Sequence, residues 1–131
     1  MPIDVVNTRN VAKTSFAPGL RISSDMDLLF ISGMTARPLD LEEGESYDYP
    51  ETLEEQARAT LENVKSVLDE AGITFNEVIK IVRFYTETAA NDIRSEYLGD
   101  WMPCSTTLGV ERLPDPGCKI MYDVTAVVPR A

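Results

Sequence analysis

The feature that most constrains the fold is a one-sided apolar stripe between residues 52 and 72. Apolar residues recur there at steps of four or three, the period of one face of an α-helix. Thr52 and Glu55 have the spacing of a capping box at a helix start, and Gly72 is typical of a helix end. The stripe consists of Leu53, Ala57, Leu61, Val64, Leu68 and Ala71. Such a helix must bury its apolar face against another layer of the protein.

Several other segments favour β-strands. Residues 21–22 and 28–32 are joined by a short polar turn and predict a hairpin. The second segment is nearly all apolar, so we expect it to be buried on both faces. Residues 78–85 are rich in β-branched and aromatic side chains, which indicates a central strand.

The second half of the chain continues this alternation. Residues 88–101 predict a shorter helix, in which Ile93, Tyr97 and Trp101 recur at steps of four. Strands are expected at 106–110 and 118–128, on either side of the turn-forming residues 114–117.

The resulting order, β-β-α-β-α-β-β, is typical of the α/β (α+β) class. It predicts a mixed sheet that two helices cover on one face. The length of 131 residues suits a single domain over residues 1–131. The second face of the sheet would need another partner, and oligomerisation is the simplest way to bury it.

Composition excludes several classes of function. The net charge of -10 opposes binding to a phosphate backbone, so we expect no nucleic-acid partner. No apolar run approaches the ~20 residues that span a bilayer, so we expect no membrane association and a cytoplasmic location. The chain has no His and two Cys without CxxC spacing. We therefore expect no metal, no cofactor and no disulfide framework.

Residues 38–50 have the composition of an exposed loop. They contain two prolines, Gly44 and many acidic residues, among them Glu42, Glu43 and Glu45. Two interpretations stay open, a lid over a binding site and a simply solvated segment.

The run at residues 103–114, P-C-S-T-T-L-G-V-E-R-L-P, resembles the P-A-R-S-x-V-x-V-x-x-L-P segment of the Rid family, also called YjgF or UK114. Further segments match the family in register, and together they cover about residues 18–128. They include 28–33, which ends in Ser-Gly, the E-Q-x-R-x-x-L-x-N-V helix at 55–64, and residues 71–72, 78–80, 91–93, 96–100 and 110–114.

The resemblance implies a chorismate-mutase-like fold and a homotrimer whose sheets line a central barrel. It also implies small-molecule sites in the clefts between neighbouring subunits. The activity known in the family is hydrolysis of reactive enamines and imines, such as 2-aminoacrylate, to a 2-keto acid and ammonia. An arginine holds the substrate carboxylate, and a glutamate near the end of the chain positions water.

The resemblance places this chain's own residues at the family's site positions. Ser105 stands where the family has its arginine, and Met121 where it has its glutamate. Thr107 takes the position of a thiol, and Leu20 lies near that of a tyrosine. The positions that keep the residues of the family's site are Ser32, Gly33 and Asn91.

Each candidate has a chemical and a structural interpretation. Ser105 and Thr107 share a strand face, and Ser105 suits hydrogen bonding better than nucleophilic attack because no His can activate it. Arg83, in an apolar strand, either replaces the missing guanidinium or forms a structural ion pair, and we favour the pair. The same choice holds for Arg21. Asp123 shares a face with Met121 and is either an acid or base or a solvated group.

Two further residue types favour packing over chemistry. Cys104 and Cys118 are expected to be small packed thiols. The same holds for Tyr85 and Tyr122, which are expected to pack and not to act as acids.

Three functions remain open. The first is a divergent Rid enzyme that acts on an imine, an enamine or a related nitrogen metabolite. The second is a small-molecule-binding or regulatory trimer without turnover, which the loss of both polar anchors motivates. The third, an endoribonuclease or translation inhibitor, is opposed by the net charge of -10.

Overall fold

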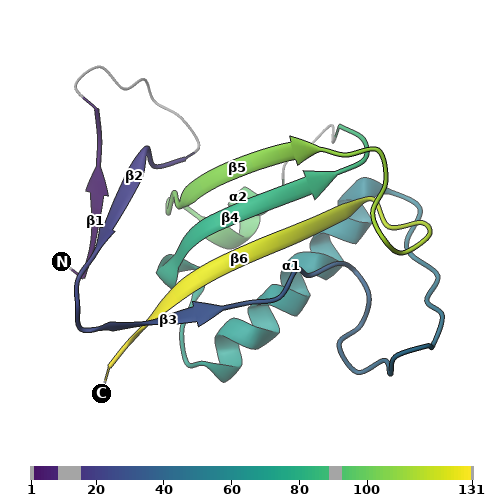
Figure 1. The fold of residues 1–131 in the computed structure, drawn as a ribbon, viewed down its shortest axis with the longest axis horizontal. Coiled ribbons are helices and arrows are strands. Elements are labelled where there is room, and N and C mark those ends of the chain that lie inside the picture. The colour runs from purple at the N-terminus through teal and green to yellow at the C-terminus, as the bar shows by residue number, and fades with distance from the viewer. Residues whose placement is uncertain (1, 9–15, 89–92, 131) are drawn as a thin grey trace.

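The computed structural model describes residues 2–8, 16–88 and 93–130. Figure 1 shows a four-stranded sheet and, apart from it, a two-stranded one. The four-stranded sheet has the order β3 (Met26–Phe30), β6 (Ile120–Pro129), β4 (Val78–Tyr85), β5 (Cys104–Gly109). β1 (Ile3–Val6) and β2 (Gly19–Ile22) form the small sheet; the helical elements are α1 (Leu53–Glu70), the 3-10 helix η1 (Phe75–Glu77) and α2 (Arg94–Leu98).

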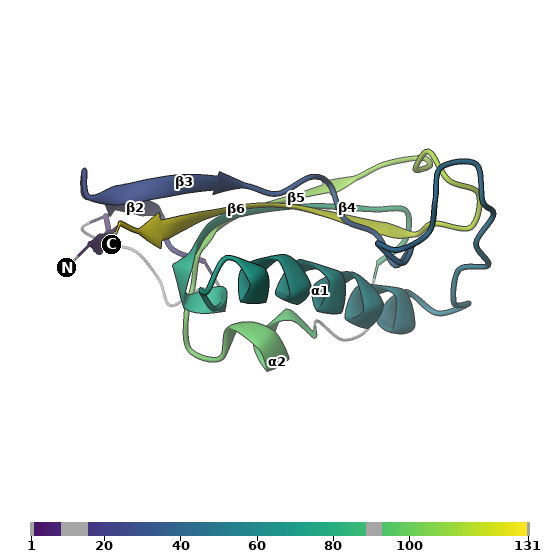
Figure 2. The ribbon, with the colours of Figure 1, turned by 90° about the horizontal axis from the view of Figure 1, so that it is seen from below.

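Both α-helices cover the same face of the four-stranded sheet, as Figure 2 shows. β4 and β5 run parallel, whereas β6 runs antiparallel to both β3 and β4. The mixed sheet with two helices on one face is therefore confirmed. The core lies between α1 and this sheet, and its residues of at most 1% exposure include Leu61, Val64, Leu68, Val78, Ile81, Tyr122, Val124 and Ala126.

The predicted first helix forms with nearly the predicted ends. Glu55 N donates to Thr52 Oγ1 at 3.1 Å, and the Thr52 hydroxyl donates to Glu55 Oε1 at 2.8 Å. Gly72 follows the helix with a φ of +75°, a left-handed conformation that glycine adopts without strain. The capping pattern and the apolar stripe thus located this element correctly.

The predicted hairpin at 21–32 is wrong. β2 pairs with β1, and β3 pairs antiparallel with β6. Leu28 is 59% exposed and Phe30 75% exposed, so β3 is not buried on both faces in the single chain. The reason is that helices cover only one face of the sheet, and alternate residues of a strand point to the other.

The second helix is shorter than the predicted 88–101, since α2 begins at Arg94 and ends at Leu98. Residues 89–92 lie outside the described part of the chain. Gly99, with a φ of +59°, ends the helix. Trp101 then donates its indole N–H to the carbonyl of Val78 at 2.7 Å. The last two strands lie within two residues of the predicted ranges.

A buried side-chain amide on α1 connects two loop segments of the fold. Gln56, with 0% exposure, donates through Nε2 to the carbonyls of Pro50 at 2.7 Å and Gly117 at 2.9 Å. Its Oε1 accepts from the backbone N–H of Lys119 at 2.8 Å. One side chain therefore joins α1, the loop before it and the turn that leads into β6.

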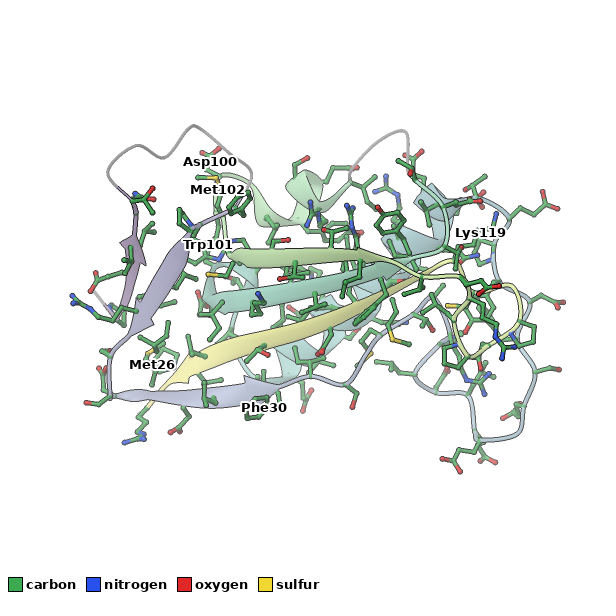
Figure 3. The ribbon with its side chains drawn as sticks, turned by 45° about the horizontal axis from the view of Figure 1, so that its top comes forward. Met26, Phe30, Asp100, Trp101, Met102 and Lys119 are labelled. Atoms are coloured by element: carbon green, nitrogen blue, oxygen red, sulfur yellow. The ribbon has the colours of Figure 1, made fainter. Side chains whose placement is uncertain are left out.

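The uncovered face of the four-stranded sheet carries exposed apolar side chains. Leu28 and Phe30 lie there on β3, and Leu108, 44% exposed, lies there on β5. Figure 3 places Phe30 on the strand at the far side of the sheet from β5. Among the described residues, no helix is long and apolar enough to cross a membrane.

Replacement of Gln56 by Leu should destabilise the protein strongly. The change keeps a similar volume but leaves three backbone groups without their hydrogen bonds. Because each such group costs about 1–3 kcal/mol when buried, we expect the free energy of unfolding to fall by about 3 kcal/mol. Urea unfolding followed by Trp101 fluorescence measures this. The exposed Glu70→Gln on the same helix should change stability by less than about 0.5 kcal/mol, and equal values for both variants would contradict the role of Gln56.

Candidate functional site

Three predicted site residues share the helix-covered face of β4 and β5. Ile81 and Tyr85 pack against the core, so Arg83 between them faces the same way. In the parallel register Ile81 pairs with Ser105, and Arg83 pairs with Thr107. Arg83, Ser105 and Thr107 therefore lie together at the sheet edge that β5 forms.

Arg94 joins these residues from α2. Its Nη1 donates to Ser105 Oγ at 3.1 Å, and its side chain is half-buried. The sequence analysis missed Arg94, since its only link to Ser105 is through space. The set Arg83, Arg94, Ser105 and Thr107 is called the arginine group below. It brings a guanidinium to Ser105, the residue that the family resemblance aligns with an arginine.

Arg83 is held against an aromatic ring. Its Cζ lies over the Tyr85 ring, 5.5 Å from the ring centroid, a cation–π contact. Its strand neighbour on β6, Tyr122, is 1% exposed. Arg83 is therefore half-buried, and its guanidinium contacts the Tyr85 ring. The predicted structural pair of Arg83 with an acidic residue stays a prediction.

Four other candidates gather around β3 and β6. Tyr122 belongs to the core, so its neighbours Met121 and Asp123 point to the uncovered face. Ser32 and Gly33 follow β3. They lie between Ile31 and Met34, whose backbone N–H groups donate to the carbonyls of Val124 and Tyr122 on β6. A Cβ built on Gly33 would lie 2.9 Å from Met121 Sδ, so Met121 packs directly against this glycine. Ser32, Gly33, Met121 and Asp123 are called the β3–β6 group.

The two groups do not meet within one chain. They lie on opposite faces of the sheet, and the order β3-β6-β4-β5 puts the strands β3 and β5 at opposite edges. Leu20 lies apart, in β2, where it pairs with Val5. Arg21 is 78% exposed and forms an ion pair with Asp4 at 3.4 Å, so it does not join the arginine group. Asn91 lies outside the described residues.

The loop at 38–50 is tied to the turn before β6. The Tyr49 hydroxyl donates to Asp115 Oδ2 at 2.7 Å and lies 3.2 Å from Thr35 Oγ1. Burial raises the pKa of Tyr49, and the hydrogen bond to Asp115 adds to the rise. A partly open cavity of about 660 Å³ lies beside the loop, lined by Arg37, Leu41, residues 43–49, Asp115 and Pro116. The loop is therefore anchored, and its cavity is separate from the arginine group.

The thiols and acids offer little further chemistry. Cys118 is 6% exposed, and burial raises the pKa of its thiol, as a packed cysteine requires. Cys104 is a half-buried free thiol. Within residues 2–8, 16–88 and 93–130, no three His, Cys, Asp or Glu side chains form a group that could hold a metal ion.

The sequence profile of the Endoribonuclease L-PSP family matches residues 9–128. The chain belongs to this family, also known as Rid or YjgF. A RutC family protein of Pyrococcus horikoshii is 30% identical over 115 residues, which cover 85% of this chain and 87% of that one. A RutC family protein of Pyrococcus abyssi is 32% identical over 92 residues, 67% of this chain and 69% of the relative.

Solved structures of Rid proteins share the fold. YyfB of Yersinia pestis, a conserved Rid protein of unknown function, superimposes with a TM-score of 0.80 at 22% identity, covering 98% of this chain and 100% of that one. A putative endoribonuclease of Thermotoga maritima has a TM-score of 0.62 at 29% identity, over 92% of this chain and 98% of its own. The chorismate-mutase-like fold predicted from the resemblance is therefore confirmed.

Tyr49→Phe should weaken the anchor of the loop in a pH-dependent way. The folded protein holds the phenol proton more tightly than the unfolded chain, so this stabilisation is complete below a pH of about 10 and is lost as the pH rises further. We expect Tyr49→Phe to lose about 1 kcal/mol at pH 7. Above pH 10 its unfolding free energy should fall less steeply than that of the wild type. Chemical denaturation between pH 7 and 11 tests this, and parallel curves would show that Tyr49 is not the group responsible.

Proposed function

We propose that this protein hydrolyses small imines or enamines that carry a carboxylate, with Arg94 as the carboxylate-binding cation. The observation that carries the proposal is the hydrogen bond of 3.1 Å from Arg94 Nη1 to Ser105 Oγ. Ser105 occupies the position of the family's arginine, and Arg94 supplies a guanidinium to the same place from a different element. A guanidinium binds a carboxylate through two parallel hydrogen bonds.

The reaction needs no redox partner. An enamine first takes a proton on carbon and becomes an iminium, which has an electrophilic carbon. The oxygen of water adds to that carbon, the carbon–nitrogen bond then breaks, and ammonia leaves as the carbonyl forms. The products are a 2-keto acid and ammonia. Binding by the guanidinium lowers the barrier mainly by orientation of the substrate carboxylate, which fixes the reacting carbon beside water.

The two hydroxyls have defined tasks in this scheme. Ser105 Oγ accepts a hydrogen bond from Arg94, so its own O–H remains available to donate to a ligand oxygen. Thr107 is exposed on the same strand face, two residues along β5. We assign both hydroxyls to hydrogen bonding with substrate or water. Neither acts as a nucleophile, since the chain has no His to activate it.

We propose further that a second copy of the chain completes the site. The arginine group and the β3–β6 group are separated within one subunit by the sheet itself. A neighbour that covers the apolar open face would bury Leu28, Phe30 and Leu108, and at its edge it can bring the β3–β6 group of one subunit toward β5 of another. A homotrimer, as the family resemblance implies, provides three such clefts. The predicted cytoplasmic location stays a prediction.

The second candidate function is binding without turnover. It is favoured by the contact between Met121 and Gly33, where a Cβ on the glycine would lie 2.9 Å from the sulfur. In the family resemblance, Met121 aligns with the glutamate that positions water, so a thioether replaces a carboxylate there. An apolar group cannot orient water, so this site can hold a ligand and leave it unchanged.

RNA cleavage is the least supported function. The matched family carries the name endoribonuclease, as does the Thermotoga maritima relative. This chain, however, has a net charge of -10 and no His for general acid–base cleavage. Arg83 and Arg94 suit a small anion at one strand edge better than a phosphate backbone.

Arg94→Met should reduce turnover of 2-aminoacrylate that a dehydratase generates in the assay. Because a charge-assisted hydrogen bond contributes about 1.5–3 kcal/mol, we expect kcat/KM to fall about 10- to 100-fold. Release of ammonia and of the keto acid is the measurement. Arg112→Met, which removes an exposed arginine outside the arginine group, should leave kcat/KM unchanged.

A second variant tests the assignment by rescue. Ser105→Arg in the Arg94→Met background returns a guanidinium to the family's position and should restore much of the lost activity. If wild type releases no more ammonia than buffer while it binds the product keto acid, the binding function replaces the enzymatic one. If Arg94→Met keeps full activity, another group holds the carboxylate.

Phe30→Glu should dissociate the proposed oligomer. Phe30 is 75% exposed in one chain, and a carboxylate in its place would be buried without a partner if a neighbour covers this face. Sedimentation velocity should show a trimer for the wild type and a smaller species for the variant. Leu39→Glu, at a 53% exposed apolar residue of the loop, is the matched control and should remain a trimer. A monomeric wild type would contradict the shared cleft.

A further inference from the structure

The helix that carries Arg94 is too short to fix its own position. α2 spans only Arg94–Leu98, and isolated helices of fewer than about 12 residues are marginal in water. Ile93, at the N-cap position, offers the helix start no side-chain hydrogen bond of the kind that Ser, Thr, Asn or Asp gives. The orientation of α2, and with it the place of Arg94, must therefore come from contacts with other elements.

An ion pair between the two helices supplies one such contact. Arg58 of α1 donates through Nη1 to Glu96 Oε1 and through Nη2 to Glu96 Oε2, both at 3.2 Å. Glu54, one turn earlier on α1, lies 3.8 Å from Nη2 of the same guanidinium. Two-pronged geometry and membership of a network are the conditions under which an exposed ion pair fixes a direction. The pair therefore holds α2 to α1, beside which it lies in Figure 2.

The buried side of α2 is held by apolar contacts. Ile93, directly before the helix, is 4% exposed and belongs to the core. The Tyr97 ring lies 5.6 Å from that of Phe75, centroid to centroid. Ile93 and Tyr97 are four residues apart and so share one side of the helix. Apolar contacts are not directional, so they press α2 onto the core without fixing its rotation about its own axis.

Arg94 and Glu96 lie on opposite flanks of this buried side. With 3.6 residues per turn, Arg94 points about 80° to one side of the line through Ile93 and Tyr97, and Glu96 about 80° to the other. Arg94 reaches Ser105 on β5 at 3.1 Å, whereas Glu96 reaches α1. A rotation of α2 that breaks one of these contacts also shifts the other. The two polar contacts therefore set the rotation of the helix together.

From this arrangement we infer that Arg58 and Glu96 are positioning residues, which act through α2 to hold the Arg94 guanidinium against Ser105. Their effect on the site is indirect, because it passes through the rotation of the helix. The inference rests on the proposed function for its consequence in ligand binding, since there Arg94 is the cation that binds the carboxylate. The position of Arg94 itself can be tested without a ligand.

Glu96→Gln tests the positioning in the ligand-free protein. The variant keeps the shape of the side chain and removes the charge that the two-pronged pair requires. NMR records the side-chain Nε–Hε signals of the arginines, and the signal of Arg94 is assigned by its loss in Arg94→Met. Ser105→Ala shows how that signal responds when the contact is absent. We expect Glu96→Gln and Arg58→Met to shift the Arg94 signal in the same direction as Ser105→Ala.

Lys65→Met is the matched control. Lys65 forms an exposed ion pair with Asp69 at 3.0 Å within α1, so this variant removes a comparable pair that does not involve α2. The Arg94 signal should stay in place. Reversal of the inter-helix pair, with Arg58→Glu and Glu96→Arg in one protein, should return the signal toward its wild-type position. An Arg94 signal that neither Glu96→Gln nor Arg58→Met moves overturns the inference.

Ligand binding separates this inference from the proposed function. Isothermal titration calorimetry measures the affinity for 2-oxobutyrate, a stable monocarboxylate. We expect Glu96→Gln to weaken binding about threefold to fivefold in the wild-type background and to have no effect in Arg94→Met, because its effect passes through Arg94. Equal weakening in both backgrounds overturns the inference. If wild type and Arg94→Met bind equally well, the proposed function fails, and a shifted Arg94 signal in Glu96→Gln still supports the inference.

Discussion

The buried amide of Gln56 is the interaction on which the rest of the structure depends. Its three hydrogen bonds join the end of the loop at 38–50, the first turns of α1 and the turn that leads into β6. Pro50 is six residues from Gln56, whereas Gly117 and Lys119 are 61 and 63 residues away, so the amide joins segments that are distant in the chain. An unsatisfied buried carbonyl or N–H is expensive, so the amide fixes the register in which β6 enters the sheet. β6 in turn lies between β3 and β4 and therefore orders the whole sheet.

Asn63, further along α1, has a similar role. Its Nδ2 donates to the carbonyls of Thr35 at 2.8 Å and Arg37 at 2.9 Å, where the chain leaves β3 for the loop. The residues of the E-Q-x-R-x-x-L-x-N-V pattern thus include two amides that hold loops to the helix. These two amides of the pattern therefore have a structural role in this chain. The same scaffold can carry a different arrangement of charges because loop anchors and site residues are separate side chains.

The arginine group shows how such a change is accommodated. The family resemblance aligns Ser105 with the family's arginine; in this structure a guanidinium reaches Ser105 from Arg94, the first residue of α2, which packs on the same face of the sheet. The hydroxyl of Ser105 is short enough to leave space for it and polar enough to bind it. Arg83, which an apolar strand would normally exclude, adds a second cation held by Tyr85.

The sequence by itself determined the long helix, the central strand, the last two strands and the family, because periodicity, capping residues and turn formers act over a few residues and leave a local signature. It also predicted that Ser105 and Thr107 share a strand face and that Arg83 lies in the central strand, but only the structure shows that these strands are neighbours. Only the tertiary structure decided that β2 pairs with β1 and β3 with β6, since an edge strand has no local mark of its partner. Only the structure brought Arg94 to Ser105 and separated the arginine group from the β3–β6 group. These relations depend on strand order and on which face the helices cover, and both arise from packing between segments that are distant in the chain.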